Sequence, residues 1–104
     1  MVWAESAVRD VEGIAAYLPE SAPGRATAGL DRLLRKAESL AVAPMSGHVV
    51  ADLARLGIYT WREAPAWPYR VFYRIAGRDV IIAAVLDGRR DLADLLLERL
   101  LRPT

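Results

Sequence analysis

The stretch YRVFYRIAGRDVIIAAVL, residues 69–86, predicts a β-hairpin. In YRVFYRI (69–75) alternate residues point to opposite faces, so both arginines share the face opposite to two of the tyrosines. AGRD (76–79) has the composition of a tight turn. VIIAAVL (80–86) is apolar throughout, which is typical of a central strand covered on both faces. These two antiparallel strands are therefore expected to form the centre of a sheet.

The residues before this hairpin predict a strand followed by two amphipathic helices. MVW (1–3) is short and β-prone. Ser6 is expected to cap the first helix and Pro19 to end it. SAPG (21–24) predicts the turn into a second helix, which ends before Pro44 and Gly47. The apolar residues at helical spacing are Val8, Val11, Ile14, Ala15 and Leu18 in the first helix, and Ala26, Leu30, Leu33, Leu34, Ala37 and Leu40 in the second.

Three further segments complete the expected fold. RLGIYTW (55–61) contains β-forming residues and predicts a strand, whereas the two prolines of EAPAWP (63–68) predict a loop. DLADLLLERLL (91–101) predicts a short helix. The expected order is β-α-α-β-β-β-α: an α+β fold with an N-terminal strand, an αα-hairpin, a three-stranded antiparallel meander and a short C-terminal helix. We expect residues 1–104 to form a single domain.

The composition excludes several classes of protein. The 104 residues contain no cysteine, which rules out disulfides, thiolate nucleophiles and thiolate zinc sites and fits a reducing cytoplasm. The acidic start of the chain does not resemble a signal peptide, and no apolar run is long enough to span a membrane. No metal-ligand cluster or phosphate-binding glycine loop is present, so we expect no metal and no cofactor. The net charge of +1 is too small to predict nucleic-acid binding.

Arginines near the hairpin form the first candidate binding site. Arg70 and Arg74 share one face of their strand, and Arg89 and Arg90 follow the end of the next strand. The hairpin should bring Arg70 close to the Arg89–Arg90 pair at one edge of the sheet, where the cluster could bind phosphates or an acidic protein surface. The alternative is that the pair only forms local contacts. Its possible local partners are Asp87, Asp91 and Asp94.

A catalytic site has little support from the sequence. The single histidine, His48, lies in a predicted loop, and Tyr73 is expected to face the core. Glu63 and Asp87 could act as bases, but acidic residues in turns are usually turn formers. We therefore assign no catalytic residue.

The C-terminal helix contains more leucine than one of its faces can bury in a small domain. This excess predicts that part of the helix binds a protein partner. The candidate partner-binding residues are Leu96, Leu97, Leu100 and Leu101.

Three segments together resemble the RelE/ParE superfamily of toxins from type II toxin–antitoxin modules. They are IAAYL (14–18), the Leu40-x-x-x-Pro44-x-x-Gly47 link and YRVFYRIAGRDVIIAAVLDGRRDL (69–92). The ending GRRD resembles the ParE-like branch. That resemblance implies an inhibitor of DNA gyrase and of replication that is not itself an enzyme and that a ParD-like antitoxin neutralises in the cytoplasm. Arg70, Arg74, Arg89 and Arg90 would then contact the target.

Two alternatives remain within the resemblance. RelE-like toxins are ribosome-dependent mRNA endonucleases and usually have a tyrosine or histidine near the last strand, but this chain has neither after residue 85. Asp87 stands where ParE-like sequences often have histidine. The other alternative is a degenerate toxin retained only for antitoxin binding. None of these three hypotheses implies direct sequence-specific binding of nucleic acid.

Overall fold

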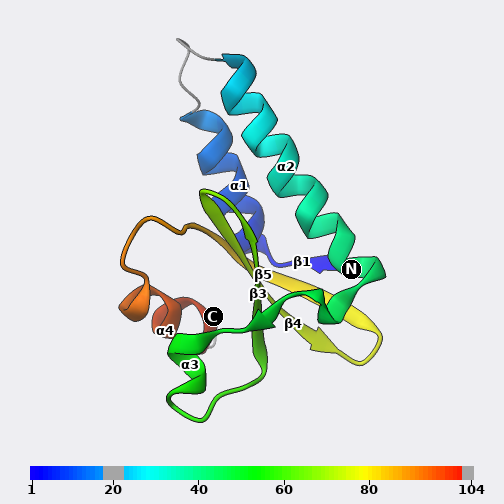
Figure 1. Cartoon of the computed structure of the whole chain (residues 1–104), viewed down its shortest axis with the longest axis vertical. Coiled ribbons are helices and arrows are strands. Elements are labelled where there is room, and N and C mark those ends of the chain that lie inside the picture. Colours follow the sequence, from blue (N-terminus) through cyan, green and yellow to red (C-terminus); the bar gives the residue numbers. More distant parts are fainter. Residues whose placement is uncertain (18–22, 102–104) are drawn as a thin grey trace.

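The computed structural model describes residues 1–17 and 23–101 and contains one five-stranded sheet with helices on both faces (Figure 1). The strands are β1 (Val2–Trp3), β2 (His48–Val49), β3 (Trp61–Ala66), β4 (Tyr69–Ala76) and β5 (Asp79–Asp87). The helices are α1 (Glu5–Ala16), α2 (Pro23–Val42), the 3₁₀ helix η1 (Pro44–Ser46), α3 (Ala51–Ala54) and α4 (Ala93–Leu101). The strand order is β1-β5-β4-β3-β2, so the expected α+β fold and its antiparallel meander are confirmed.

The predicted hairpin forms the centre of this sheet. β4 pairs with β5 from Tyr69 opposite Asp87 to Ala76 opposite Asp79. Gly77 in the connecting turn has a φ of +61°, a conformation that favours glycine. On its other edge β5 pairs in parallel with β1. The strand is therefore hydrogen-bonded on both sides, as its apolar sequence indicated.

A β-bulge at Ala83 interrupts the pairing of the hairpin. Phe72 lies opposite Ala84, but the next residue, Tyr73, lies opposite Ile82, so Ala83 is the extra residue. The carbonyl of Ala83 accepts a hydrogen bond from the hydroxyl of Ser6 at 3.2 Å. Ser6 therefore does not cap α1 as predicted. Ala4 is the N-cap residue, and it makes no side-chain cap.

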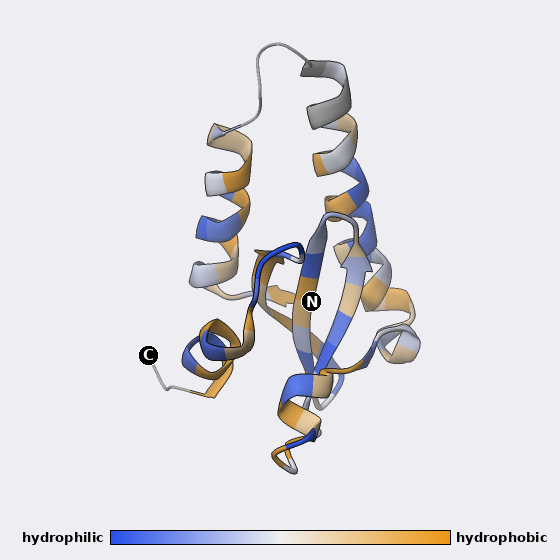
Figure 2. Ribbon diagram, turned by 60° about the vertical axis from the view of Figure 1, so that its left-hand side comes forward, coloured by the Kyte–Doolittle hydropathy of each residue, from blue (hydrophilic) through white to orange (hydrophobic). Residues whose placement is uncertain are grey.

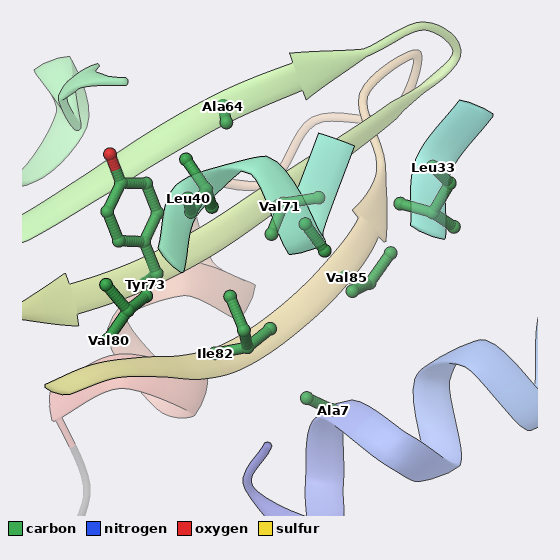
Figure 3. Close-up of a cluster of buried hydrophobic side chains, with 10 residues drawn as sticks. Ala7, Leu33, Leu40, Ala64, Val71, Tyr73, Val80, Ile82 and Val85 are labelled. Atoms are coloured by element: carbon green, nitrogen blue, oxygen red, sulfur yellow. The ribbon is translucent and has the colours of Figure 1, made fainter. Parts of the chain in front are cut away.

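Each face of the sheet has its own core. α1 and α2 cover one face, where Leu33, Leu40 and Ile82 are fully buried (Figure 3). α3 and α4 cover the other face, where Leu53 and Leu96 pack with Phe72. Because β5 supplies side chains to both cores, its residues between Asp79 and Asp87 are all apolar.

Two local predictions for the segment before β4 are wrong. RLGIYTW was expected to be a strand, but residues 55–57 form a turn after α3, in which Gly57 has a φ of +79°, and residues 58–60 are irregular. EAPAWP was expected to be a loop, but β3 extends through Pro65. Proline is tolerated there because β2 pairs only with Arg62 and Glu63, which leaves this end of β3 as a sheet edge.

Other local features were missed or lie outside the described residues. β2, α3 and η1 were not predicted from the sequence. The second helix does end before Pro44, as expected. The predicted end of the first helix at Pro19, with Leu18 in its apolar stripe and the start of the turn at 21–22, lies outside the described residues. No described helix is both long and apolar enough to cross a membrane.

An ion pair fixes α4 to the opposite layer. Arg99 of α4 donates to both carboxylate oxygens of Asp10 of α1, at 3.0 and 2.7 Å. The same Asp10 carboxylate accepts the backbone N–H of Val85 at 2.9 Å. β1 pairs only with Ile81 and Ile82, so Asp10 provides the hydrogen-bond acceptor for the N–H of Val85 further along β5. Through its ion pair with Arg99, Asp10 also connects α1 to α4 on the other face of the sheet.

The leucines of α4 divide into two sets. Leu96 and Leu100 are buried against the sheet with Leu92, which precedes the helix, and Leu95 is partly buried against the same core, whereas Leu97 and Leu101 are 38% and 39% exposed. Leu96→Ala should therefore lower the free energy of unfolding by about 3 kcal/mol, because it leaves a cavity in the core. Leu97→Ala should cost less than about 0.5 kcal/mol. Urea denaturation of both variants measures the difference, and equal losses would contradict this packing of α4.

Candidate functional site

The corner between β4 and β5 brings Arg70 next to the turn that carries the arginine pair. Arg70 lies opposite Leu86, and the N–H of Gly88 donates to the carbonyl of Pro68 at 2.7 Å. A Cβ atom at Gly88 would lie 2.9 Å from Cδ of Arg70 and 3.2 Å from the Pro68 carbonyl oxygen. Only glycine fits this approach without displacing its neighbours. The predicted proximity of Arg70 to the start of the arginine turn is thus observed.

Asp87 and Arg89 form a local clasp in this turn. The Asp87 carboxylate accepts the Arg89 backbone N–H at 2.9 Å and its guanidinium at 3.0 and 2.7 Å. The side-chain hydrogen bond from Arg89, followed by the backbone one, holds the pKa of Asp87 below its ordinary value of 3.8. The same contact raises the pKa of Arg89. Arg89 therefore makes the local contact with Asp87 that the sequence offered as the alternative to target binding.

Arg90 differs from its neighbour. Its backbone N–H donates to the carbonyl of Asp87 at 3.3 Å, which continues the turn. Its side chain is exposed and forms no ion pair with any carboxylate of residues 1–17 and 23–101. Of the arginine pair, Arg90 is the residue whose guanidinium the described structure leaves without an acidic partner.

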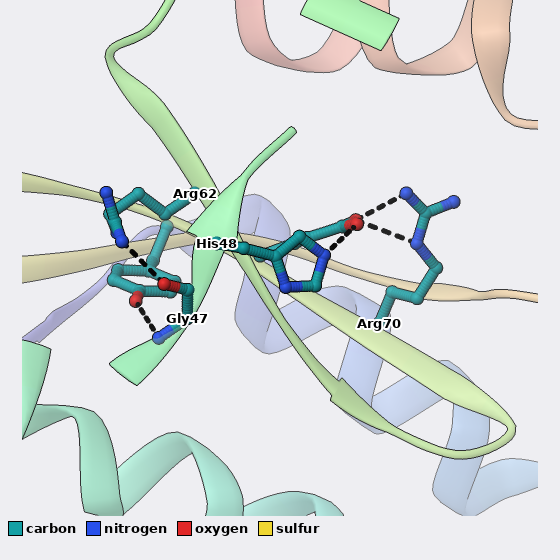
Figure 4. Close-up of polar contacts among 6 residues, drawn as sticks. Gly47, His48, Arg62 and Arg70 are labelled. Atoms are coloured by element: carbon teal, nitrogen blue, oxygen red, sulfur yellow. Dashed lines mark hydrogen bonds and ion pairs between the residues drawn. The ribbon is translucent and has the colours of Figure 1, made fainter. Parts of the chain in front are cut away.

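Glu63 connects Arg70 to His48. Glu63 is 8% exposed and lies on the same side of the sheet as Phe72, its cross-strand partner. Arg70 donates to Oε2 of Glu63 through Nε, at 2.8 Å, and through Nη2, while His48 Nε2 lies 2.8 Å from Oε1 (Figure 4). The Arg70 guanidinium also lies 5.0 Å from the centroid of the Phe72 ring. The nearly buried carboxylate of Glu63 thus fixes the orientation of the Arg70 side chain.

Tyr73 has a structural role on the other side of the sheet. Its buried hydroxyl donates to the Pro44 carbonyl at 2.7 Å and accepts the Gly47 N–H at 3.0 Å. Arg62 donates to the Gly47 carbonyl at 2.5 Å (Figure 4). The expectation that Tyr73 belongs to the core is confirmed. These bonds fix the segment that leads into β2 and so position His48.

Arg74 lies apart from the other arginines. It is exposed and pairs across the sheet with Trp61 and Ile81, near the turn at residues 77–78. Arg74 lies four residue steps along the extended strand from Arg70, which corresponds to about 13 Å. The arrangement is therefore one corner that contains Arg70, Arg89 and Arg90, with Arg74 further along the same face.

Sequence reasoning missed the role of Glu63 because EAPAWP was interpreted as a loop. A strand there would have placed Glu63 and Arg70 on one face of neighbouring strands. Within the described residues, no group of three His, Cys, Asp or Glu side chains could hold a metal ion.

Comparisons with known proteins agree on one family. The model of the ParE toxin of the type II toxin–antitoxin system, parDE, matches residues 1–92. Toxin ParE3 of Caulobacter vibrioides is 38% identical over 68 residues, which is 65% of this chain and 64% of that protein. The match therefore spans just under two thirds of the length of this curated relative.

The clasp between Asp87 and Arg89 makes a prediction about pH. Because the pKa of Asp87 is lower in the folded protein, the stability from this contact is complete above about pH 3.8 and is lost as the pH falls through the lowered pKa. Arg89→Ala should raise the pKa of Asp87 toward 3.8, measured by NMR titration of its carboxyl carbon. Arg78→Ala, in the distant β4–β5 turn, should leave it unchanged. An Asp87 pKa that is the same in all three proteins would contradict the clasp.

The contacts of Glu63 predict unequal costs for its removal and for that of its exposed partner. Glu63→Gln should lower the free energy of unfolding by about 2 kcal/mol, because it weakens charge-assisted bonds at a nearly buried position. His48→Ala should cost about 0.5 kcal/mol or less, since its side chain is 64% exposed. Thermal or urea unfolding measures both. A loss for Glu63→Gln no larger than that for His48→Ala would show that the Arg70 contact contributes nothing.

Proposed function

The chain belongs to the ParE toxin family of type II toxin–antitoxin systems, and from this we propose that it acts by binding DNA gyrase and thereby blocks replication. The action is inhibition by binding, with no reaction catalysed by the toxin and no cofactor. A ParD-like antitoxin neutralises it in the cytoplasm.

The observation that carries this proposal is the exposed arginine turn after β5. Gly88 packs on Arg70, and Asp87 holds Arg89, so the turn is held in one conformation. A preorganised turn loses little conformational entropy when it binds. Arg90 is exposed at its surface, where a guanidinium can form paired hydrogen bonds with a carboxylate of a target protein.

The other two candidate arginines have supporting roles in the proposed contact. Arg70 is held by Glu63 and packs under Gly88, so it shapes the corner and adds positive charge. Arg74 is exposed on the same face and extends the cationic surface along β4. Such charges increase the rate of encounter with an acidic surface more than they increase the final affinity.

The antitoxin contact on α4 is supported by the two exposed leucines. Leu97 and Leu101 are one turn apart and form an apolar strip on the outer side of the helix. Leu96 and Leu100, also candidates from the sequence, are buried under the same helix and would hold that strip in place. We therefore assign direct antitoxin contact to Leu97 and Leu101.

One observation favours a second candidate function, cleavage of mRNA on the ribosome. His48 is exposed and lies against Glu63, which also binds Arg70. A histidine oriented by a carboxylate can act as a general base toward a 2′-hydroxyl group. We favour gyrase because Glu63 binds Arg70, and Arg90, which forms no ion pair among the described residues, is exposed in the turn after β5.

A two-target assay tests the proposal. Purified free toxin is added to a gyrase supercoiling and cleavage-complex reaction and, separately, to ribosomes translating a defined mRNA. Wild type should inhibit supercoiling without cutting mRNA. Arg89→Ala/Arg90→Ala should need at least about tenfold more protein for the same inhibition, as expected on loss of a central arginine contact. The matched control Arg55→Ala/Arg78→Ala removes two exposed arginines elsewhere and should behave as wild type.

The other outcomes of this assay decide between the candidates. Cleaved mRNA with gyrase unaffected, and loss of cleavage in His48→Ala, would replace the gyrase proposal with the endonuclease. Absence of activity on both targets, with antitoxin binding intact, would indicate a degenerate toxin and would also overturn the proposal.

A further inference from the structure

Two surfaces of this chain have opposite charge and matching apolar parts. The first is a groove of about 450 Å³ between α2 and the end of β3. Arg32, Arg35 and Lys36 line its helix wall, and their spacing of three and four residues places them on one strip of α2. None of the three forms an ion pair with a carboxylate among the residues that the structure describes. This wall of the groove therefore attracts negative charge.

The other wall of the groove is apolar. It consists of Pro65, Ala66 and Trp67, and the tryptophan is 68% exposed. An exposed tryptophan beside arginines has the composition of a protein-binding surface, where aromatic residues and arginine are enriched. The complementary surface would carry carboxylates next to exposed apolar side chains.

The outer face of α4 has this composition. Leu97 and Leu101 are exposed and lie one turn apart, and the exposed Asp94 and Glu98 form a second pair one turn apart. Positions three and four residues apart are neighbours on a helix, so the four side chains form one continuous patch. Neither carboxylate of the patch forms an ion pair among the described residues.

No positive charge within α4 neutralises this patch. The one basic residue of the helix, Arg99, points inward and binds Asp10. α1 also has exposed carboxylates, but there Arg9 lies among them and contacts Glu5 at 3.9 Å. Among these helices, α4 therefore offers the acidic and apolar face that fits the groove.

The groove and the α4 patch cannot meet within one molecule. α2 packs on the side of the sheet that contains Leu33 and Leu40, whereas α4 packs on the side of Phe72. Figure 2 shows the hydrophilic part of α2 beside the turn that joins β3 to β4, with α4 well away from it. The two surfaces can therefore contact each other only between two copies of the chain.

We propose that the groove receives α4 of a second copy of this chain. Asp94 and Glu98 of one copy bind the cationic strip of the other, and Leu97 and Leu101 pack against Trp67. The inference is independent of the proposed function, because it uses no property of gyrase or of the antitoxin.

The proposed contact is head-to-tail. Each copy uses its groove for one neighbour and its α4 for another, so association continues beyond a dimer unless a ring closes. The antitoxin contact proposed above uses the same two leucines, Leu97 and Leu101. One α4 therefore cannot hold both partners at once, and self-association belongs to the toxin without antitoxin.

Sedimentation velocity of the purified, antitoxin-free chain tests the inference. At low salt the weight-average mass should rise with concentration past that of a dimer, and added salt should lower it, because the ionic contacts are screened. Arg32→Glu/Arg35→Glu should raise the concentration needed for association by at least about tenfold, since it places like charges opposite one another. The matched control Arg55→Glu/Arg78→Glu makes the same charge change outside the groove and should stay within about twofold of wild type.

A charge swap identifies the two surfaces as partners. Asp94→Lys/Glu98→Lys should abolish association as the groove variant does, but a mixture of the two variants should associate again. In the mixture, the acidic α4 of the groove variant fits the cationic groove of the helix variant. Arg32→Gln/Arg35→Gln should give a smaller loss of association, and it keeps the test valid if charge reversal disturbs folding.

Three results would overturn the inference. The first is a wild-type chain that stays monomeric at every concentration at low salt. The second is association that the groove variants weaken no more than the control does. The third is a mixture of the two reversed variants that stays monomeric, since complementary charges would then have failed to restore the contact.

Discussion

The structure depends on one strand, β5, being packed on both faces and paired on both edges. α1 and α2 bury Val80, Ile82 and Val85, while α3 and α4 bury Ala84 and Leu86. Strict alternation would put residues 82 and 85 on opposite faces. The bulge at Ala83 resets the alternation, and Ser6 of α1 donates a hydrogen bond to the bulge carbonyl. The first helix is therefore tied to the point where the strand changes its register.

The end of the same strand sets the geometry of the arginine corner. Because β4 and β5 stay in register from Tyr69 to Phe72, Gly88 emerges directly over the stem of Arg70. Glu63 then determines the direction in which the Arg70 guanidinium points, and Asp87 does the same for Arg89. Two arginines are thus fixed by acidic partners, and Arg90 is left exposed. The carboxylate of Asp87 therefore has a local role, which is to bind Arg89.

The two faces of the sheet carry surfaces with different chemistry. On the α3–α4 side lie the arginine corner and the exposed leucines of α4. On the α1–α2 side lies the groove lined by Arg32, Arg35, Lys36 and Trp67. A net charge of only +1 conceals this division, since the carboxylates that balance the arginines are distributed unevenly among them. Arg70, Arg89 and Arg99 each have an acidic partner, and the arginines of the groove have none among the described residues.

The sequence alone determined the secondary structure wherever a pattern was long and regular. The alternation of residues 69–75, the apolar run 80–86 and the helical stripe of α2 each required a particular element, because no other arrangement buries those side chains together. The proximity of Arg70 to Gly88 followed from the hairpin. Only the tertiary structure decided the rest. Pro65 can lie in a strand because β2 does not extend as far as this residue, so no hydrogen bond from the missing N–H is required there. His48 and Arg70 are brought to one site because both bind the carboxylate of Glu63. Such contacts join residues far apart in the chain, and no local pattern contains them.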